Sequence, residues 1–283
     1  MRVLRGSDAG EWLQRRLFAS DGVGCFAGAG FEAYARILHP LDGRRLDWTD
    51  RGDGVVPRVV DERMWTWAEA AHALGRELSP LVATAESLLG IGGARWDDGW
   101  EADIPRLGWL DPALFAALVP VLAGATSTPD DAVLGVWGGW AELHGDEGAV
   151  ATLALAGEGV PVMYGRPGVG REVRDALREG ALLAVPPRDG WSEAAYRDYL
   201  LLGCALSELA DPDWGYDAGL GWDRPWRSPT PQLVWPADHA WLVSTEIDLD
   251  STFVAGSRAL VDAVLRVPGL EVVEVGERDL LER

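Results

Sequence analysis

Short segments with strand or helix character follow one another along this chain, and their order restricts the fold more than any other feature. Aromatic and β-branched residues predict a strand at 31–38, and similar patterns predict strands at 240–247 and 271–275. Between the last two segments, Ser257 is placed to cap a helix. Helices and strands mix without strict β–α–β alternation, which is typical of the α+β class. The sequence therefore predicts one α+β domain over residues 1–283, with a mixed β-sheet and several flanking helices.

Capping and turn signals place the remaining elements. A Ser, Thr or Asp before a helical pattern, with Glu three residues later or Pro directly after it, predicts where a helix starts. Such signals predict helices that start near Asp8, Thr66, Ser79 and Asp111. A polar helix is also expected at 171–179, and strands are expected at 132–137, 149–155 and 159–164. Loops are expected at 41–60 and 211–231, while residues 193–209 leave helix and strand as open alternatives.

The chain is strongly acidic, with 45 Asp and Glu residues against 25 basic residues and a formal net charge of −20 at pH 7. Such a charge repels nucleic acid and anionic membranes as whole-molecule partners. It attracts cations, so the expected partner is a basic protein or a cationic small ligand. All the basic residues are Arg, and the absence of Lys excludes a Schiff-base nucleophile and a phosphate-loop lysine.

The two cysteines, Cys25 and Cys204, lie far apart among apolar neighbours. They are expected to be free thiols in the core, which suits a reducing compartment. No signal peptide and no long apolar run are evident in the sequence. These features predict a cytoplasmic protein with no membrane partner.

Three segments carry a family resemblance: FEAYARILHP at 31–40, STPDDAVLGVWGGW at 127–140 and RSPTPQLVWPADHAWLVSTEIDLDSTFVAGS at 227–257. In this order they resemble a family of uncharacterised proteins of GC-rich bacteria, and the resemblance spans most of the chain. It implies a single cooperative unit of about the length of this chain. It implies no activity, substrate or catalytic residue.

Three alternating acids, Glu246, Asp248 and Asp250, follow a predicted strand. On a strand they share one face, and carboxylates so close together repel one another unless a cation lies among them. If a metal is bound, Asp248 and Asp250 are its expected ligands, because Mg²⁺ and Ca²⁺ prefer oxygen. If none is bound, an arginine is expected within ion-pair distance, and the candidates are Arg36, Arg197 and Arg258. The Asp-x-Asp-x-Thr order also resembles a haloacid-dehalogenase-like phosphatase motif, but too few residues follow Thr252 to supply the rest of that site.

Tryptophan is unusually frequent, with 15 residues. Trp stacks on cations and planar ligands, but it also fills cores and anchors loops. Trp137 and Trp140 flank a Gly-Gly pair, and His39 and His239 lie beside predicted strands, where each is placed to line a binding site. The spacing of the histidines is not that of metal ligands.

Two classes of function stay open. The first is a non-catalytic, acidic, Trp-rich intracellular interaction protein, which the charge and the lack of a complete catalytic set favour. The second is a small-molecule enzyme that uses the carboxylate cluster, with or without a metal. No cofactor is predicted. The candidate ligand-binding residues for either class are Arg36, His39, Trp137, Trp140, His239, Glu246, Asp248, Asp250 and Arg258.

Overall fold

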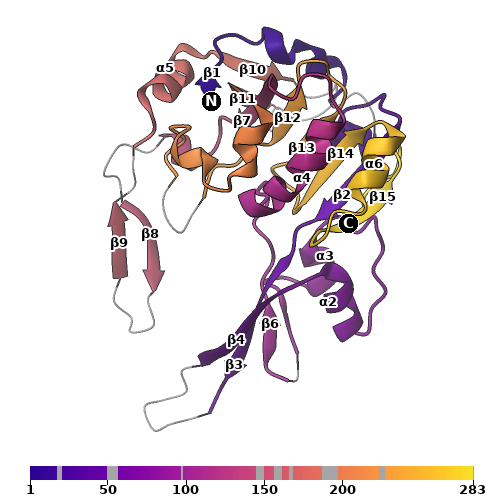
Figure 1. Ribbon diagram of the computed structural model, residues 1–283. Helices are drawn as coiled ribbons and strands as arrows, with labels where there is room; N and C mark the ends of the chain where they lie inside the picture. Colours follow the sequence, from indigo (N-terminus) through magenta and orange to yellow (C-terminus); the bar gives the residue numbers. More distant parts are fainter. Residues whose placement is uncertain are drawn as a thin grey trace.

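The computed structural model describes residues 1–17, 21–49, 57–96, 98–144, 150–155, 161–165, 168–186, 197–222 and 227–282. The expectations for residues 50–56, 193–196 and 223–226 therefore lie outside the described residues. The secondary structure confirms the α+β class (Figure 1).

In the described part of the chain, nine strands form one large sheet. All of its pairings are antiparallel, so the sheet is not mixed in strand direction as the sequence suggested. The strands in sheet order are β1 (Arg2–Val3), β11 (Arg197–Cys204), β7 (Ala132–Trp137), β12 (Leu233–Pro236), β13 (Leu242–Thr245), β14 (Ser251–Gly256), β2 (Ala33–Leu38) and β15 (Glu271–Val275), with β10 (Leu182–Val185) also paired to β11. The segment with open alternatives thus contains a strand, β11.

Helices cover both faces of this sheet. One face packs against α4 (Pro112–Gly124), α5 (Arg171–Glu179) and α6 (Arg258–Val264), and the other against the 3₁₀ helix η1 (Asp8–Arg15) and the short α1 (Gly24–Ala27). Leu118 and Leu122 of α4 and Ile37 of β2 are fully buried in the first layer. Each such side chain stabilises the fold by about 1.5–3 kcal/mol relative to exposure.

The capping signals are confirmed at three helices. Thr66 and Glu69 form a reciprocal capping box at the start of α2 (Trp67–Ala73). Asp111 accepts a hydrogen bond from the amide of Ala113 in α4, and Ser257 caps α6. The helix expected at Ser79 is wrong: α3 (Ala85–Leu89) begins later. Residues 80–83 instead offer their carbonyl groups to a buried side chain of the large sheet, described below.

A smaller sheet lies where a loop was expected at 41–60. Its strand order is β4 (Arg58–Trp65), β3 (Leu41–Asp47), β6 (Trp100–Ala102) and β5 (Ala94–Arg95), and the β3–β4 hairpin projects from the body (Figure 1). Trp65 stacks on Trp96 with ring centroids 4.9 Å apart, and Gly43 lies so close beneath the Trp65 ring that a Cβ would collide with it. Contacts between segments distant in sequence therefore make strands of a polar stretch whose local composition favours a loop.

The remaining described strands, β8 (Val150–Leu155) and β9 (Pro161–Gly165), form a separate antiparallel pair close to the predicted ranges. Short 3₁₀ segments follow β7, β11 and the start of the long loop; they are η2 (Ala141–His144), η4 (Leu206–Ala210) and η5 (Trp214–Tyr216). Among the described helices, none combines the length and apolar character needed to cross a bilayer.

Candidate functional site

A cleft of about 460 Å³ lies where β2 leads into β3, beside the start of α4. Its volume is in the range of small-ligand sites. The walls are mainly apolar and include an indole ring. The apolar side chains that line it are Pro40, Met64, Pro105, Trp109, Ala113 and Leu114.

His39, one of the predicted site residues, lines this cleft and is 3% exposed. Its Nε2 lies 2.9 Å from Thr252 Oγ1, which is 2.7 Å from Thr245 Oγ1. Burial, together with the charge of Arg36, lowers the pKa of His39 to about 3, so the ring is neutral at physiological pH. Its Nδ1 has no hydrogen-bond partner in the described part of the chain. Buried polar atoms are nearly always bonded, so this nitrogen is an exception among the buried polar atoms of the fold.

Two arginines line the cleft, and a carboxylate outside the lining pairs with each. Arg106 Nη2 lies 2.7 Å from Glu142 Oε1, and its guanidinium lies 4.6 Å from the centre of the Trp140 ring. Burial would raise the pKa of Glu142, but hydrogen bonds from Arg106 and Ser228 lower it on balance. The side chain of Arg227 pairs with Asp213 at 2.8 Å. The positive charges of the cleft are therefore compensated within the protein.

The two carboxylates that line the cleft, Asp42 and Asp111, have no ion pair in the described residues. Partial burial raises the pKa of Asp42, and the charges of Asp103 and Asp111 raise it further. One oxygen of Asp111 accepts a hydrogen bond from the amide of Ala113, 2.7 Å away. Asp111 thus weakens the ionisation of Asp42, and a cation in the cleft would relieve this repulsion.

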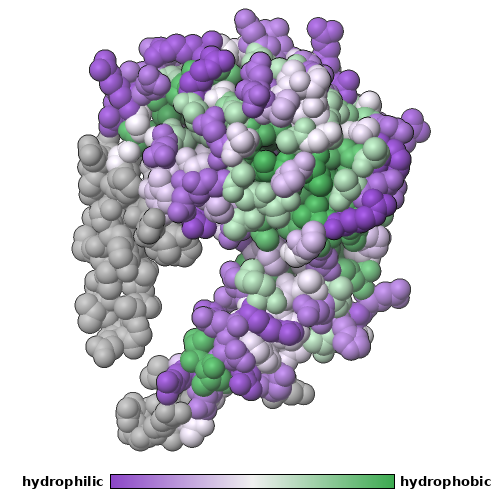
Figure 2. All heavy atoms as spheres, in the orientation of Figure 1, coloured by the Kyte–Doolittle hydropathy of each residue, from purple (hydrophilic) through white to green (hydrophobic). Residues whose placement is uncertain are grey.

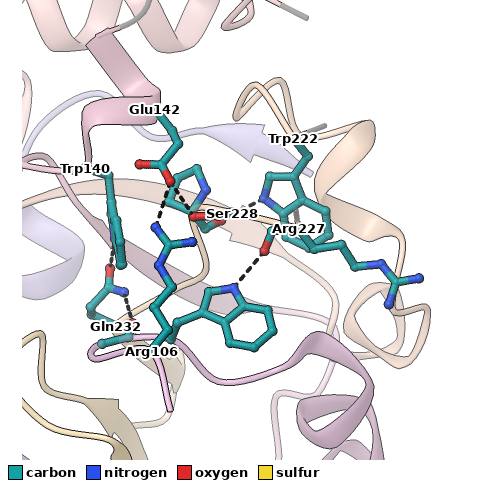
Figure 3. A network of polar contacts seen from close by, with 10 residues as sticks. Arg106, Trp140, Glu142, Trp222, Arg227, Ser228 and Gln232 are labelled. Atoms are coloured by element: carbon teal, nitrogen blue, oxygen red, sulfur yellow. Dashed lines mark hydrogen bonds and ion pairs between the residues drawn. The ribbon is translucent and has the colours of Figure 1, made fainter. Parts of the chain in front are cut away.

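A hydrogen-bond network holds one wall of the cleft in place (Figure 3). The buried amide of Gln232 accepts from Trp140 Nε1 at 3.1 Å and donates to the carbonyl of Gly108 at 2.8 Å. Trp109 Nε1 donates to the carbonyl of Arg227 at 2.9 Å. Three segments distant in sequence are joined in this way, so the wall is organised before any ligand binds.

The predicted acidic strand is a tight turn between β13 and β14, and its carboxylates do not share one face. Arg197 Nη2 lies 2.9 Å from both Glu246 Oε1 and Asp248 Oδ2. The side chain of Asp248 is 75% exposed, whereas that of Glu246 is 8% exposed. The expectation of a shared carboxylate face is wrong because the chain reverses at this point. The expected arginine within ion-pair distance is present as Arg197.

Asp250 points away from the other two acids and is completely buried. Its Oδ2 accepts a hydrogen bond from the amide of Ala85 at 2.7 Å, and the charge of Arg36 acts on it. The guanidinium of Arg36 is also fully buried and donates to Ser251 Oγ and to the carbonyls of Pro80, Val82 and Ala83. Arg36 and Asp250 therefore serve the core and offer no surface to a ligand.

The other predicted residues are divided among three places. Trp137 and Trp140 pack edge to face with centroids 6.1 Å apart, and Trp140 supports the cleft wall through Arg106. His239 stacks on Trp12 on a different part of the surface, at a centroid distance of 4.3 Å. Arg258 pairs with Asp262 and Glu274 on α6 and β15. In the described part of the chain, no group of three or more His, Cys, Asp or Glu side chains is arranged to hold a metal ion.

Asp250 makes stability depend on pH. Burial raises its pKa to about 6, above the ordinary value of 3.8, so the folded state binds its proton more tightly than the unfolded state does. Its contribution to stability is full below pH 4 and is lost as the pH rises through 6. We expect the free energy of unfolding of the wild type, relative to Asp250→Asn, to fall by about 3 kcal/mol over this window. Urea titrations from pH 4 to 7.5 test this, and parallel curves for the two proteins would refute it.

His39, a predicted site residue, lines the cleft, but no sequence pattern indicated that the charged residues of the cleft belong to a site. The local composition around Asp42 predicts a loop, and the sequence around Asp111 predicts only a helix cap. No local sequence pattern indicates that Arg106 and Arg227 line a cleft, because they meet only when the loops fold together. Comparison of the chain with protein-family models, with curated proteins and with solved structures finds no match, so function has to be inferred from the site.

Proposed function

We propose that this protein is a non-catalytic binding protein that takes a small organic cation into the cleft beside His39. The balance of charges in the cleft carries this proposal. Arg106 and Arg227 are each compensated by a carboxylate outside the lining, whereas Asp42 and Asp111 form no ion pair in the described part of the chain. The uncompensated charge within the cleft is therefore negative and favours a cationic ligand.

The walls indicate what else the ligand carries. Met64, Trp109 and Leu114 offer apolar and aromatic surface, which an inorganic ion would leave unused. An indole ring near a carboxylate also suits an ammonium group through cation–π attraction. An amine with an aromatic or aliphatic body therefore matches the cleft better than a metal ion does, and the net charge of −20 would concentrate such cations near the protein.

The proposal predicts a preference for charged over neutral ligands of the same shape. We expect 2-phenylethylamine to bind and its uncharged analogue 2-phenylethanol to bind at least about tenfold more weakly, which corresponds to 1.4 kcal/mol or more. In the double variant Asp42→Asn, Asp111→Asn, the amine should lose about the same factor, because Asn keeps the shape and the helix cap but not the charge. Isothermal titration calorimetry at low and high salt measures both effects.

Asp130→Asn is the matched control, since it removes one exposed carboxylate outside the cleft. It should leave the affinity within about twofold, because salt screens the field of an exposed charge that does not line the cleft. Equal binding of the amine and the alcohol, or an unchanged affinity in the double variant, would contradict the proposal.

A further inference from the structure

The two carboxylates that line the cleft, Asp42 and Asp111, come from different elements. Asp42 lies in β3, where its backbone carbonyl accepts a hydrogen bond from the amide of Asp103 at 2.9 Å. Asp111 is the N-cap residue of α4, and its side chain is held by the amide of Ala113. Because regular structure fixes both backbones, the fold sets the spacing of the two carboxylates.

Both carboxylates keep oxygen atoms for a ligand. Asp42 is partly open to solvent, and its side chain forms no hydrogen bond with the described residues. In Asp111 the bond to Ala113 uses Oδ1, and Oδ2 forms none within the same part of the chain. The nearby Arg44 is paired with Asp103 at 2.8 Å. The cleft therefore offers two anionic groups to a ligand rather than one.

An apolar side chain accompanies each carboxylate along the wall. Met64 of β4 lies directly opposite Asp42 in the β3–β4 pairing and is 54% exposed. Leu114 follows Asp111 by three residues, which makes them neighbours at the start of α4. No residue of α4 has a polar side chain, and Figure 2 shows hydrophobic side chains gathered over α4 and α6. The lining thus places hydrophobic surface beside each of two negative groups.

We propose that the ligand of the cleft is an aliphatic diamine, with one ammonium group at Asp42, the other at Asp111 and the methylene chain on the apolar wall between them. This inference rests on the proposed function and names the class of ligand. A monoamine compensates one carboxylate, whereas a diamine compensates both. The two arginines of the cleft are paired with carboxylates, which reduces their repulsion of a dication. A divalent metal ion has the same charge, but it prefers about six or more oxygen ligands and leaves the apolar surface uncovered.

A comparison of diamines with monoamines of equal chain length tests this inference. The probes are the α,ω-diamines and the n-alkylamines with three, five and seven carbon atoms. Isothermal titration calorimetry at physiological ionic strength screens the field of the acidic surface beyond about 8 Å. We expect one diamine to bind at least about tenfold more tightly than its monoamine. This ratio should be largest at one chain length, because the spacing of the carboxylates is fixed.

Two single variants, Asp42→Asn and Asp111→Asn, separate the two contacts. Each removes one negative charge and keeps the shape of the side chain, and Asn also caps a helix. In either variant the ratio of diamine to monoamine affinity should fall below about threefold. Asp130→Asn is the matched control, because it removes an exposed carboxylate outside the cleft and should leave the ratio unchanged.

Equal ratios at every chain length overturn the inference, since the second ammonium group then meets only the general negative field of the protein. A ratio that either cleft variant leaves unchanged overturns it as well. So does calcium chloride that displaces the best diamine at equal concentration, because charge alone then accounts for binding. Monoamines that bind without a diamine advantage overturn this inference but support the proposed function, whereas a cleft that binds no amine contradicts both.

Discussion

Replacing Arg36 by Met is expected to lower the free energy of unfolding by about 4 kcal/mol, a large part of the stability of an ordinary domain. The guanidinium is completely buried and donates at 2.7 Å to the carbonyl oxygens of both Val82 and Ala83. Met fills similar space but leaves these carbonyls without their donor, and it leaves the buried Asp250 without its countercharge. Both losses act in the same direction.

Urea denaturation followed by tryptophan fluorescence measures this loss through the midpoint of the transition. Arg258→Met is the control, because Arg258 forms its ion pairs on the surface and its removal should change the midpoint little. Adding Asp250→Asn to Arg36→Met should recover part of the lost stability, because no uncompensated carboxylate then stays in the core. A midpoint for Arg36→Met equal to that of the control would mean that Arg36 does not hold residues 80–83 to the sheet.

Replacing Arg197 by Met is expected to cost about 3 kcal/mol at pH 7, because it leaves Glu246 buried without a countercharge. Burial already raises the pKa of Glu246 despite the attraction of Arg197, so without Arg197 this carboxyl group takes up a proton more readily still. Protonation removes the buried charge. The loss of stability should therefore shrink as the pH is lowered toward 5.

Asp248→Asn provides the contrast at the same turn. Asp248 contacts the same nitrogen of Arg197, but its side chain is 75% exposed and solvated, so its replacement should stay within about 0.5 kcal/mol. Thermal and urea unfolding of both variants at pH 5 and pH 7 separates the two cases. If Asp248→Asn destabilised the protein as much as Arg197→Met, the division of this turn into one buried and one exposed carboxylate would be wrong.

Local patterns were sufficient for some regular elements, but they did not predict β10, β12 and β14 of the large sheet. The strand at 132–137, the helix at 171–179 and the strand at 271–275 have the predicted bounds, and the helix caps at Thr66, Asp111 and Ser257 are confirmed. These signals depend on residues within one turn of helix or a few positions along a strand, so a sequence read by itself contains them.

The alternation of acidic residues at every second position was not sufficient to predict the structure of residues 246–250. The acids occupy every second position, as on a strand, yet the chain turns back after Thr245 and pairs Thr245 with Thr252. Once the chain reverses, alternate residues no longer share a face. Glu246 and Asp248 therefore meet Arg197, while Asp250 enters the core near Arg36.

The sequence by itself determined the α+β class, the positions of some strands and of most helix starts, and the strong negative charge, because each depends on composition or on contacts between near neighbours. Only the tertiary structure decided that polar residues 41–47 and 58–65 form a projecting hairpin. It alone decided that Asp42, Arg106, Asp111 and Arg227 meet around one cleft. Pairing between distant segments settles which charges are compensated and which edges stay open, and no local pattern records that pairing.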